Sequence, residues 1–232
     1  MAIPTPKDLT KEKSLFALWR LSFKFEQSRF NLIAALLVSG MILRFVWLVP
    51  EYPELITGQL RRLVTAGIAF APSTLGFLIA GFTVFVTVIR IDVFLEMAQR
   101  EKPGTGESFL KYNLSAFMVV FVHYVTYLFC CITLDLFIQT GGLASVALAN
   151  ARTYPEIAGQ VDTVKYWVSG GLLMFMGGWT VYLVMLLKSL VFNVYHVTLT
   201  AVRWEWEKSS NSKPSVPKVP ETQCTRDQVK KL

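Results

Sequence analysis

The sequence from Ala66 to Ile89 reads AGIAFAPSTLGFLIAGFTVFVTVI and contains no charged residue. A helix of about 20 apolar residues matches the ~30 Å hydrocarbon core of a bilayer, and it satisfies its own backbone hydrogen bonds there. Residues 30–50, 114–138 and 166–192 are similar stretches with one charged residue each. The sequence therefore predicts an all-α membrane protein with four transmembrane helices.

Composition and charge agree with a membrane protein. The chain is 53% hydrophobic and 17% charged, below the roughly 25% charged residues of soluble domains. Of 23 Lys and Arg residues, six precede the first span, four lie between spans two and three and seven follow span four, against two in each remaining loop. The positive-inside rule then predicts that both termini are cytoplasmic. The net charge of +7 reflects this orientation, and we expect no direct binding of nucleic acid.

Three regions are expected along the chain. Residues 1–29 form a cytoplasmic segment, in which Phe16, Trp19 and Phe23 predict an amphipathic helix from Ser14 to Asn31. That helix either lies along the inner headgroups, so that membrane lipid is a partner, or packs as an extension of the first span. Residues 30–208 form the transmembrane domain. Residues 209–232 are polar and predict a disordered tail, which is either a docking element or an unconstrained terminus.

The loops carry further patterns. After the second span, the helix is expected to continue into the cytoplasm until Pro103 and Gly104 stop it. On the outer side, residues 51–65 predict one interfacial turn or a short helix, and the second loop predicts a helix from Leu143 to Ala151. The charged continuation of the second span is the candidate docking surface for a partner, with the residues Arg90, Glu96, Arg100 and Lys102.

Small residues recur at helical spacing in two spans, where they let helix backbones approach closely. The second span contains Gly76 and Ala80 with Gly81 beside them. The fourth span contains the seven-residue pairs Gly170 with Gly177 and Gly171 with Gly178. These residues pack either the helices of one subunit or the contacts between subunits.

Polar side chains inside spans cost several kcal/mol unless they are paired or hydrated. His123, Tyr127, Cys131 and Asp135 follow one another at four-residue steps along the third span. The stripe either lines an aqueous path or consists of packing residues, with His123 bonded to a neighbouring carbonyl. Arg44 and Asp135 both fall in the outer leaflet, and we predict that they form an ion pair.

Enzyme chemistry has no support in the sequence. Phosphate-binding GxxxxGK[ST], zinc-protease HExxH and GxSxG nucleophile motifs are absent, and the only two histidines lie in separate spans. We name no catalytic residue and expect no metal and no cofactor.

The run Thr74 to Phe82, TLGFLIAGF, is followed by a charged segment and an aromatic-rich third span. This layout resembles small four-span bacterial membrane proteins of anti-phage defence loci, such as the membrane subunit of the Kiwa system. The resemblance implies a homo-oligomer, a tetramer, in the bacterial inner membrane. It also implies that the protein senses infection and works with a soluble cytoplasmic partner that acts on nucleic acid.

Two functions of different classes remain open. In the first, the protein is a non-enzymatic membrane sensor and scaffold that holds a soluble partner on its basic cytoplasmic face. In the second, it is an ion channel or pore-forming effector whose lumen is lined by the third-span stripe or the glycine ridges. We favour the first because a water-filled pore needs rings of polar residues, and this chain has few polar groups within its spans.

Overall fold

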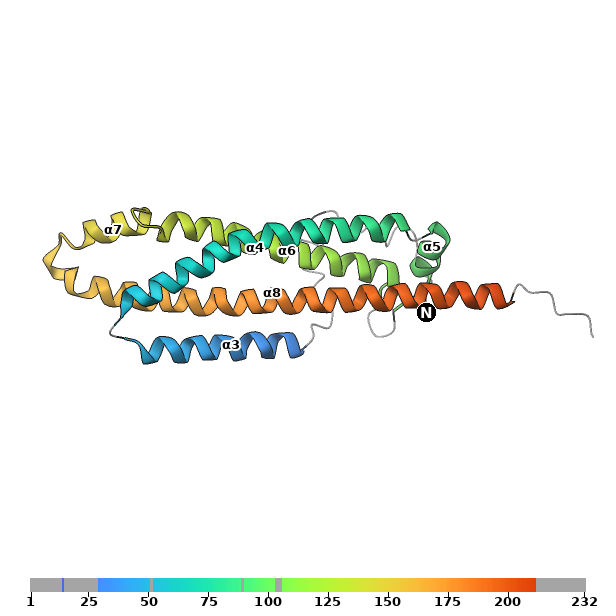
Figure 1. Cartoon of the computed structure of the whole chain (residues 1–232), viewed down its shortest axis with the longest axis horizontal. Coiled ribbons are helices and arrows are strands. Elements are labelled where there is room, and N and C mark those ends of the chain that lie inside the picture. Colours follow the sequence, from blue (N-terminus) through green and yellow to red (C-terminus); the bar gives the residue numbers. More distant parts are fainter. Residues whose placement is uncertain (1–13, 15–28, 51, 89, 103–105, 212–232) are drawn as a thin grey trace, which may run out of the picture. The chain divides into compact units, whose positions relative to one another are not determined.

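The computed structural model describes residues 14, 29–50, 52–88, 90–102 and 106–211. It contains the helices α3 (Arg29–Leu48), α4 (Pro53–Val88), α5 (Ile91–Gln99), α6 (Phe109–Ile138), α7 (Leu143–Ala151) and α8 (Pro155–Asn211). Four of them, α3, α4, α6 and α8, are long and apolar enough to cross a membrane. The fold class predicted from the sequence, an all-α membrane protein with four spanning helices, is confirmed (Figure 1).

The second spanning helix begins earlier than expected. Residues 55–63 form neither a separate turn nor a separate short helix, because α4 is continuous from Pro53. Proline is favoured at the first position of a helix, where its missing N–H has no intrahelical role. Ile56, Leu60 and Val64 then recur at four-residue spacing and are completely buried. Burial of this apolar stripe extends the helix through a segment that two arginines had marked as a loop.

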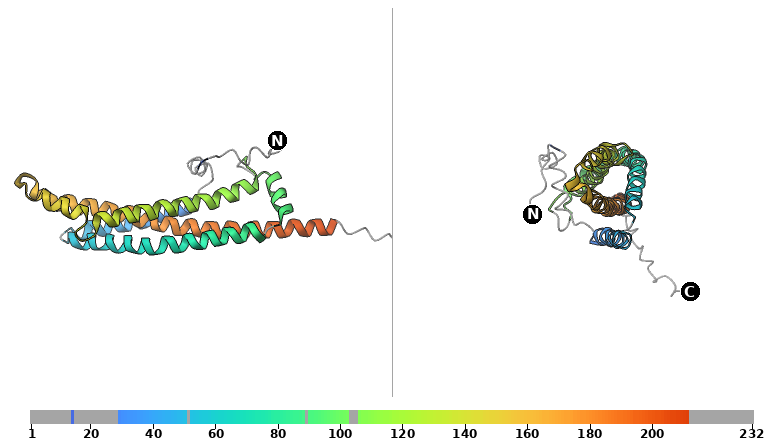
Figure 2. Two further views of the ribbon diagram at one scale, coloured as in Figure 1. Left: turned by 90° about the horizontal axis from the view of Figure 1, so that it is seen from above. Right: turned by 90° about the vertical axis from the view of Figure 1, so that its left-hand side faces the viewer.

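The same helix also ends earlier than expected. It does not continue as one helix toward Pro103, because Arg90 has an extended backbone (φ −64°, ψ 146°) and α5 is a separate helix. Figure 2 shows α5 turned across the direction of α4 and α6. Its buried residues are Val93 and Met97, and the ring of Phe94 lies 6.1 Å from that of Phe85 on α4. A straight continuation would leave this apolar face of α5 without protein contacts.

Main-chain hydrogen bonds tie α5 to the start of α6. The amide of Lys102 donates to the carbonyl of Glu107 (2.8 Å), and the amide of Phe109 donates to the carbonyl of Arg100 (2.9 Å). Ser108 is the N-cap of α6 and accepts a hydrogen bond from the Lys111 amide (3.2 Å). The main chain of residues 100–102 is thus hydrogen-bonded to that of residues 107–109.

The remaining boundaries follow or extend the sequence predictions. The helix predicted from Leu143 to Ala151 is confirmed as α7. Helix α8 begins at Pro155, well before the predicted span start at 166, and continues to Asn211, beyond the predicted tail boundary at 209. Almost all of the predicted amphipathic helix, Ser14 to Asn31, and the tail after residue 211 lie outside the described residues.

The structure divides into two units at His196, so that α8 contributes to both. In the first unit, α4, α6 and α8 surround a common core, as the right-hand view of Figure 2 shows. Its fully buried side chains include Leu60, Val64, Tyr124, Tyr127, Cys131 and Leu183. Helix α3 lies against α8 and contributes Val46 to this core. In the second unit, Arg203 and Glu207 form an ion pair of 2.8 Å along α8.

Candidate functional site

A buried polar group joins α6 to α8 in the middle of the first unit. The Tyr127 hydroxyl lies 2.7 Å from the Thr180 hydroxyl, which itself donates to the carbonyl of Met176 (2.7 Å). A threonine hydroxyl carries one hydrogen, so Tyr127 must be the donor to Thr180. One turn away, the Tyr124 hydroxyl donates to the carbonyl of Leu183 (3.2 Å). Both tyrosine hydroxyls are therefore satisfied by α8.

Gly67 on α4 allows the close approach of α4 to these residues. A Cβ at this position would lie 2.7 Å from Cys131 Sγ and 2.8 Å from Tyr127 Oη. Such distances are shorter than van der Waals contact, so a side chain here would force the side chains of Cys131 and Tyr127 to move. The sequence pattern does not mark Gly67, because an isolated glycine in an apolar run is no sign of a contact.

The third-span stripe does not present one continuous polar face. Tyr127 and Cys131 are completely buried in protein, whereas His123 and Asp135 are half-buried. His123 Nδ1 lies 2.8 Å from the carbonyl of Val119 in its own helix. Because a carbonyl only accepts, this bond requires the Nδ1–H form of the ring. The arrangement matches the packing interpretation of the stripe more closely than an aqueous path.

Arg44 and Asp135 do not pair within one chain. Arg44 is exposed on α3 and Asp135 is half-buried on α6. Among the described residues, no N–O distance between these two side chains falls within 4.0 Å. The physical reason is helix placement, because α3 packs against α8 and not against α6.

Arg61 was expected in a loop but lies on α4. It makes a polar contact at the C-terminal end of α6. Its Nε donates to the carbonyl of Ile138 at 2.6 Å. Ile138 is the last residue of α6, where carbonyl groups have no intrahelical partner and the helix dipole favours a cation. The apolar residues at four-residue spacing around Arg61, such as the buried Leu60, are the sequence signal that could have placed Arg61 on a helix.

The two small-residue ridges have different environments. On α8, a Cβ at Gly170 would lie 2.8 Å from Val46 Cγ1, and one at Gly177 or Gly178 would overlap Ile42 or Ser39. These three glycines therefore allow α3 to pack closely against α8. Nothing in the described structure lies within 4 Å of the Cβ positions of Gly171, Gly76 and Gly81, and Ala80 is exposed.

The four predicted docking residues contact neighbours on α5 or at the start of α6. Arg90 pairs with Asp92 (3.1 Å), Arg100 pairs with Glu96 (2.6 Å), and the Lys102 ammonium lies 3.0 Å from the centre of the Tyr112 ring. Segment 90–111 contains four basic and four acidic residues. It is therefore a neutral, internally paired element and not a basic patch.

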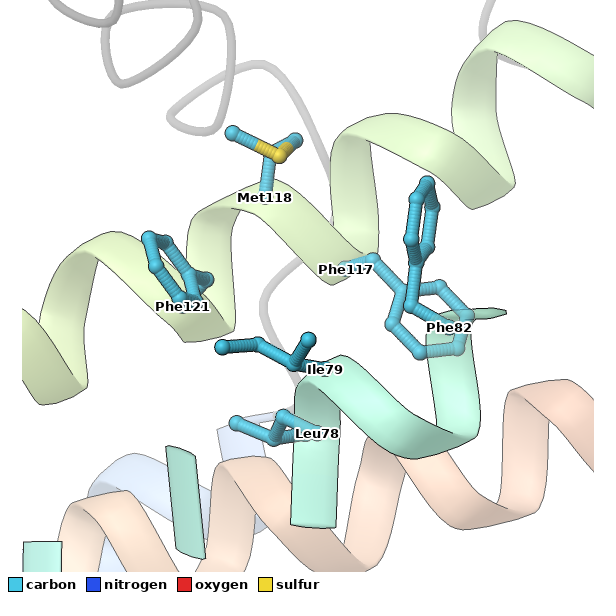
Figure 3. Close-up of a pocket in the computed structure, with 6 residues that line it drawn as sticks. All are labelled: Leu78, Ile79, Phe82, Phe117, Met118 and Phe121. Atoms are coloured by element: carbon cyan, nitrogen blue, oxygen red, sulfur yellow. The ribbon is translucent and has the colours of Figure 1, made fainter. Parts of the chain in front are cut away.

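A hydrophobic pocket of about 160 Å³ lies between α4 and α6 on the side of the bundle nearer α5. Figure 3 shows its lining, which consists of Leu78, Ile79, Phe82, Phe117, Met118 and Phe121. The rings of Phe82 and Phe117 lie 5.5 Å apart at one end of it. The pocket contains no group suited to catalysis, and its chemistry is limited to holding an apolar group.

Within the described ranges, no three His, Cys, Asp or Glu side chains come together as a metal site. Comparisons of the chain with protein-family models, with curated proteins and with solved structures found no match.

Proposed function

We propose that the protein is a non-enzymatic sensor and scaffold of the bacterial inner membrane, with both termini in the cytoplasm and α5 on the cytoplasmic side. In this proposal it acts as a homo-oligomer, a tetramer by its resemblance to the Kiwa membrane subunit, and recruits a soluble cytoplasmic partner in anti-phage defence. The charge distribution of the sequence supports the orientation.

One observation favours a scaffold over a channel that runs through a single copy of the chain. The space between α4, α6 and α8 is filled by side chains, since Tyr124, Tyr127 and Cys131 are 0% exposed. A conducting path needs a hydrated lumen or a dewetting gate, and this core supplies neither. A channel would have to form between copies of the chain.

Recruitment of a partner does not rest on net charge in this proposal. Within segment 90–111, residues 90–102 and 106–111 are held by their own ion pairs and by the hydrogen bonds between the end of α5 and the start of α6. Binding through its surface would use shape and directed hydrogen bonds, which depend weakly on salt, rather than a basic patch.

Two experiments test this proposal. Purification from the native host in mild detergent should recover a soluble protein together with the wild-type chain, and replacement of residues 91–99 by a flexible linker should abolish its recovery. Recovery of the partner by the linker variant at the wild-type level would contradict the role of α5. Reconstitution of the purified protein alone into liposomes should give no ion flux above empty vesicles, and robust conductance would favour the channel.

A further inference from the structure

The pocket between α4 and α6 has the size and lining of a site for an apolar group. Its six lining side chains contain only carbon and one sulfur. A cavity of ~150 Å³ lined by Leu, Ile and Phe stays dry and binds benzene in a well-studied engineered protein, so a cavity of this size excludes water and accepts hydrocarbon. The pocket of about 160 Å³ has a similar size and an equally apolar lining, but it is open to the surface of the bundle.

The position of the pocket indicates which apolar ligand can reach it. All six lining residues belong to the membrane-spanning parts of α4 and α6. Ile79 at its edge is 54% exposed, and the neighbouring Phe77 is 63% exposed, so the pocket opens onto the surface that faces lipid. We infer that it holds an acyl chain of a bilayer phospholipid.

Aromatic contacts connect this pocket to α5. Phe82 contacts Phe117 (ring centres 5.5 Å apart), Phe117 contacts Phe85 (5.8 Å), and Phe85 contacts Phe94 on α5 (6.1 Å). Phe82 and Phe117 line the pocket itself. An acyl chain in the pocket supports these two rings on their open side, and its withdrawal frees them to move. The occupied pocket therefore holds α5 in place, and this last step rests on the proposed sensor function.

Two substitutions on α4 test the binding site. Ile79→Trp fills the pocket from its exposed edge, while Phe77→Trp adds the same side chain at a neighbouring exposed position that does not line it. Each variant is placed in nanodiscs that contain a phosphatidylcholine with a diazirine on one acyl chain, illuminated and mapped by mass spectrometry. Adducts on Phe117, Met118 or Phe121 should form in wild type and Phe77→Trp and drop several-fold in Ile79→Trp.

Either of two results would overturn the lipid site. One is an unchanged yield of these adducts in Ile79→Trp. The other is their absence in wild type, as expected when a second copy or another protein covers the pocket. Because Ile79 is exposed, the variant should fold, and an unchanged thermal midpoint verifies this. A second filling variant, Met118→Trp, approaches from α6 and should give the same loss.

Hydrogen exchange of residues 91–99 in the same nanodiscs tests the connection to α5. Exchange should be slower in lipid than in a detergent too short to fill the pocket, and Ile79→Trp should abolish this difference whereas Phe77→Trp keeps it. If Ile79→Trp leaves the lipid-dependent difference in hydrogen exchange of α5 unchanged, the connection between the pocket and α5 is overturned. The lipid adducts would still test the binding site independently. Lipid adducts without any recovered protein partner would instead refute the proposed scaffold function alone.

Discussion

The hydroxyl groups of Tyr127 on α6 and Thr180 on α8 lie 2.7 Å apart, and the Thr180 hydroxyl donates a hydrogen bond to the carbonyl of Met176. In an apolar environment, a donor without an acceptor costs more than the bond itself contributes. This pair therefore fixes the rotation and the height of α6 relative to α8. The neighbouring hydrogen bond from Tyr124 on α6 to the carbonyl of Leu183 on α8 depends on the same alignment of the two helices.

Removal of the Tyr127 hydroxyl should weaken the α6–α8 contact. Tyr127→Phe leaves the ring in place and should lower the free energy of unfolding by about 0.6 kcal/mol, the average for hydrogen bonds between membrane helices, and by no more than about 1.7 kcal/mol. Unfolding by SDS titration in mixed micelles measures the change. Thr180→Val should cost a similar amount, and the double variant should cost less than the sum. Full additivity would mean that the two hydroxyls do not interact.

Gly67→Ala should be destabilising despite the higher helix propensity of alanine. The added Cβ would lie 2.7 Å from Cys131 Sγ and 2.8 Å from Tyr127 Oη, and overpacking of this kind costs about 1–3 kcal/mol. Gly58→Ala on the same helix is the matched control, because no atom lies within 4 Å of its Cβ position. The control should be neutral or stabilising. Equal midpoints for the two variants in the SDS titration would contradict the close approach of α4 and α6.

Gly178→Ala should loosen α3 from α8, because its Cβ would overlap Ser39. Gly171→Ala is the matched control, because Gly171 lies on another face of α8 with open space at its Cβ position. Limited proteolysis of the chain between α3 and α4 in detergent reports the detachment of α3. Faster cleavage is expected for Gly178→Ala only, and faster cleavage of both variants would point to a general effect of helix substitution.

Arg61→Ala should destabilise the α7 end of the bundle, because it removes a charge-assisted hydrogen bond to the last carbonyl of α6. Such bonds contribute about 1.5–3 kcal/mol. The neighbouring Arg62 is exposed, and Arg62→Ala should change the free energy of unfolding by no more than about 0.5 kcal/mol. Chemical unfolding of both variants compares them directly. The prediction fails if Arg62→Ala is the more destabilising change.

Arg44→Ala and Asp135→Asn should have independent effects on stability. The sequence analysis predicted a coupled pair, but the two side chains lie on helices that do not pack together. In a double-mutant cycle, the interaction energy should stay within about 0.5 kcal/mol of zero, as for distant sites. A larger coupling energy that appears only in the oligomer would show that the pair forms between copies.

The local sequence determined the number of spanning helices and the all-α character of the chain. Four apolar runs specify four spanning helices, because only hydrogen-bonded helices satisfy a backbone in lipid. The Leu143–Ala151 helix was also readable, since it lies between Gly142 and Pro155, which favour helix boundaries. The seven-residue spacing of Gly170 and Gly177 correctly indicated a close helix contact, but not which helix would occupy it.

Contacts between distant segments decided the rest. Whether residues 55–64 form a loop or a helix depended on the burial of Ile56, Leu60 and Val64 against other helices. The break at Arg90 depended on the packing of Phe94 against Phe85. Arg61, Gly67 and the pocket at Phe82 and Phe117 acquire their roles only when α4 lies beside α6. Sequence periodicity records which face of a helix is apolar, and only the tertiary structure selects the partner that covers it.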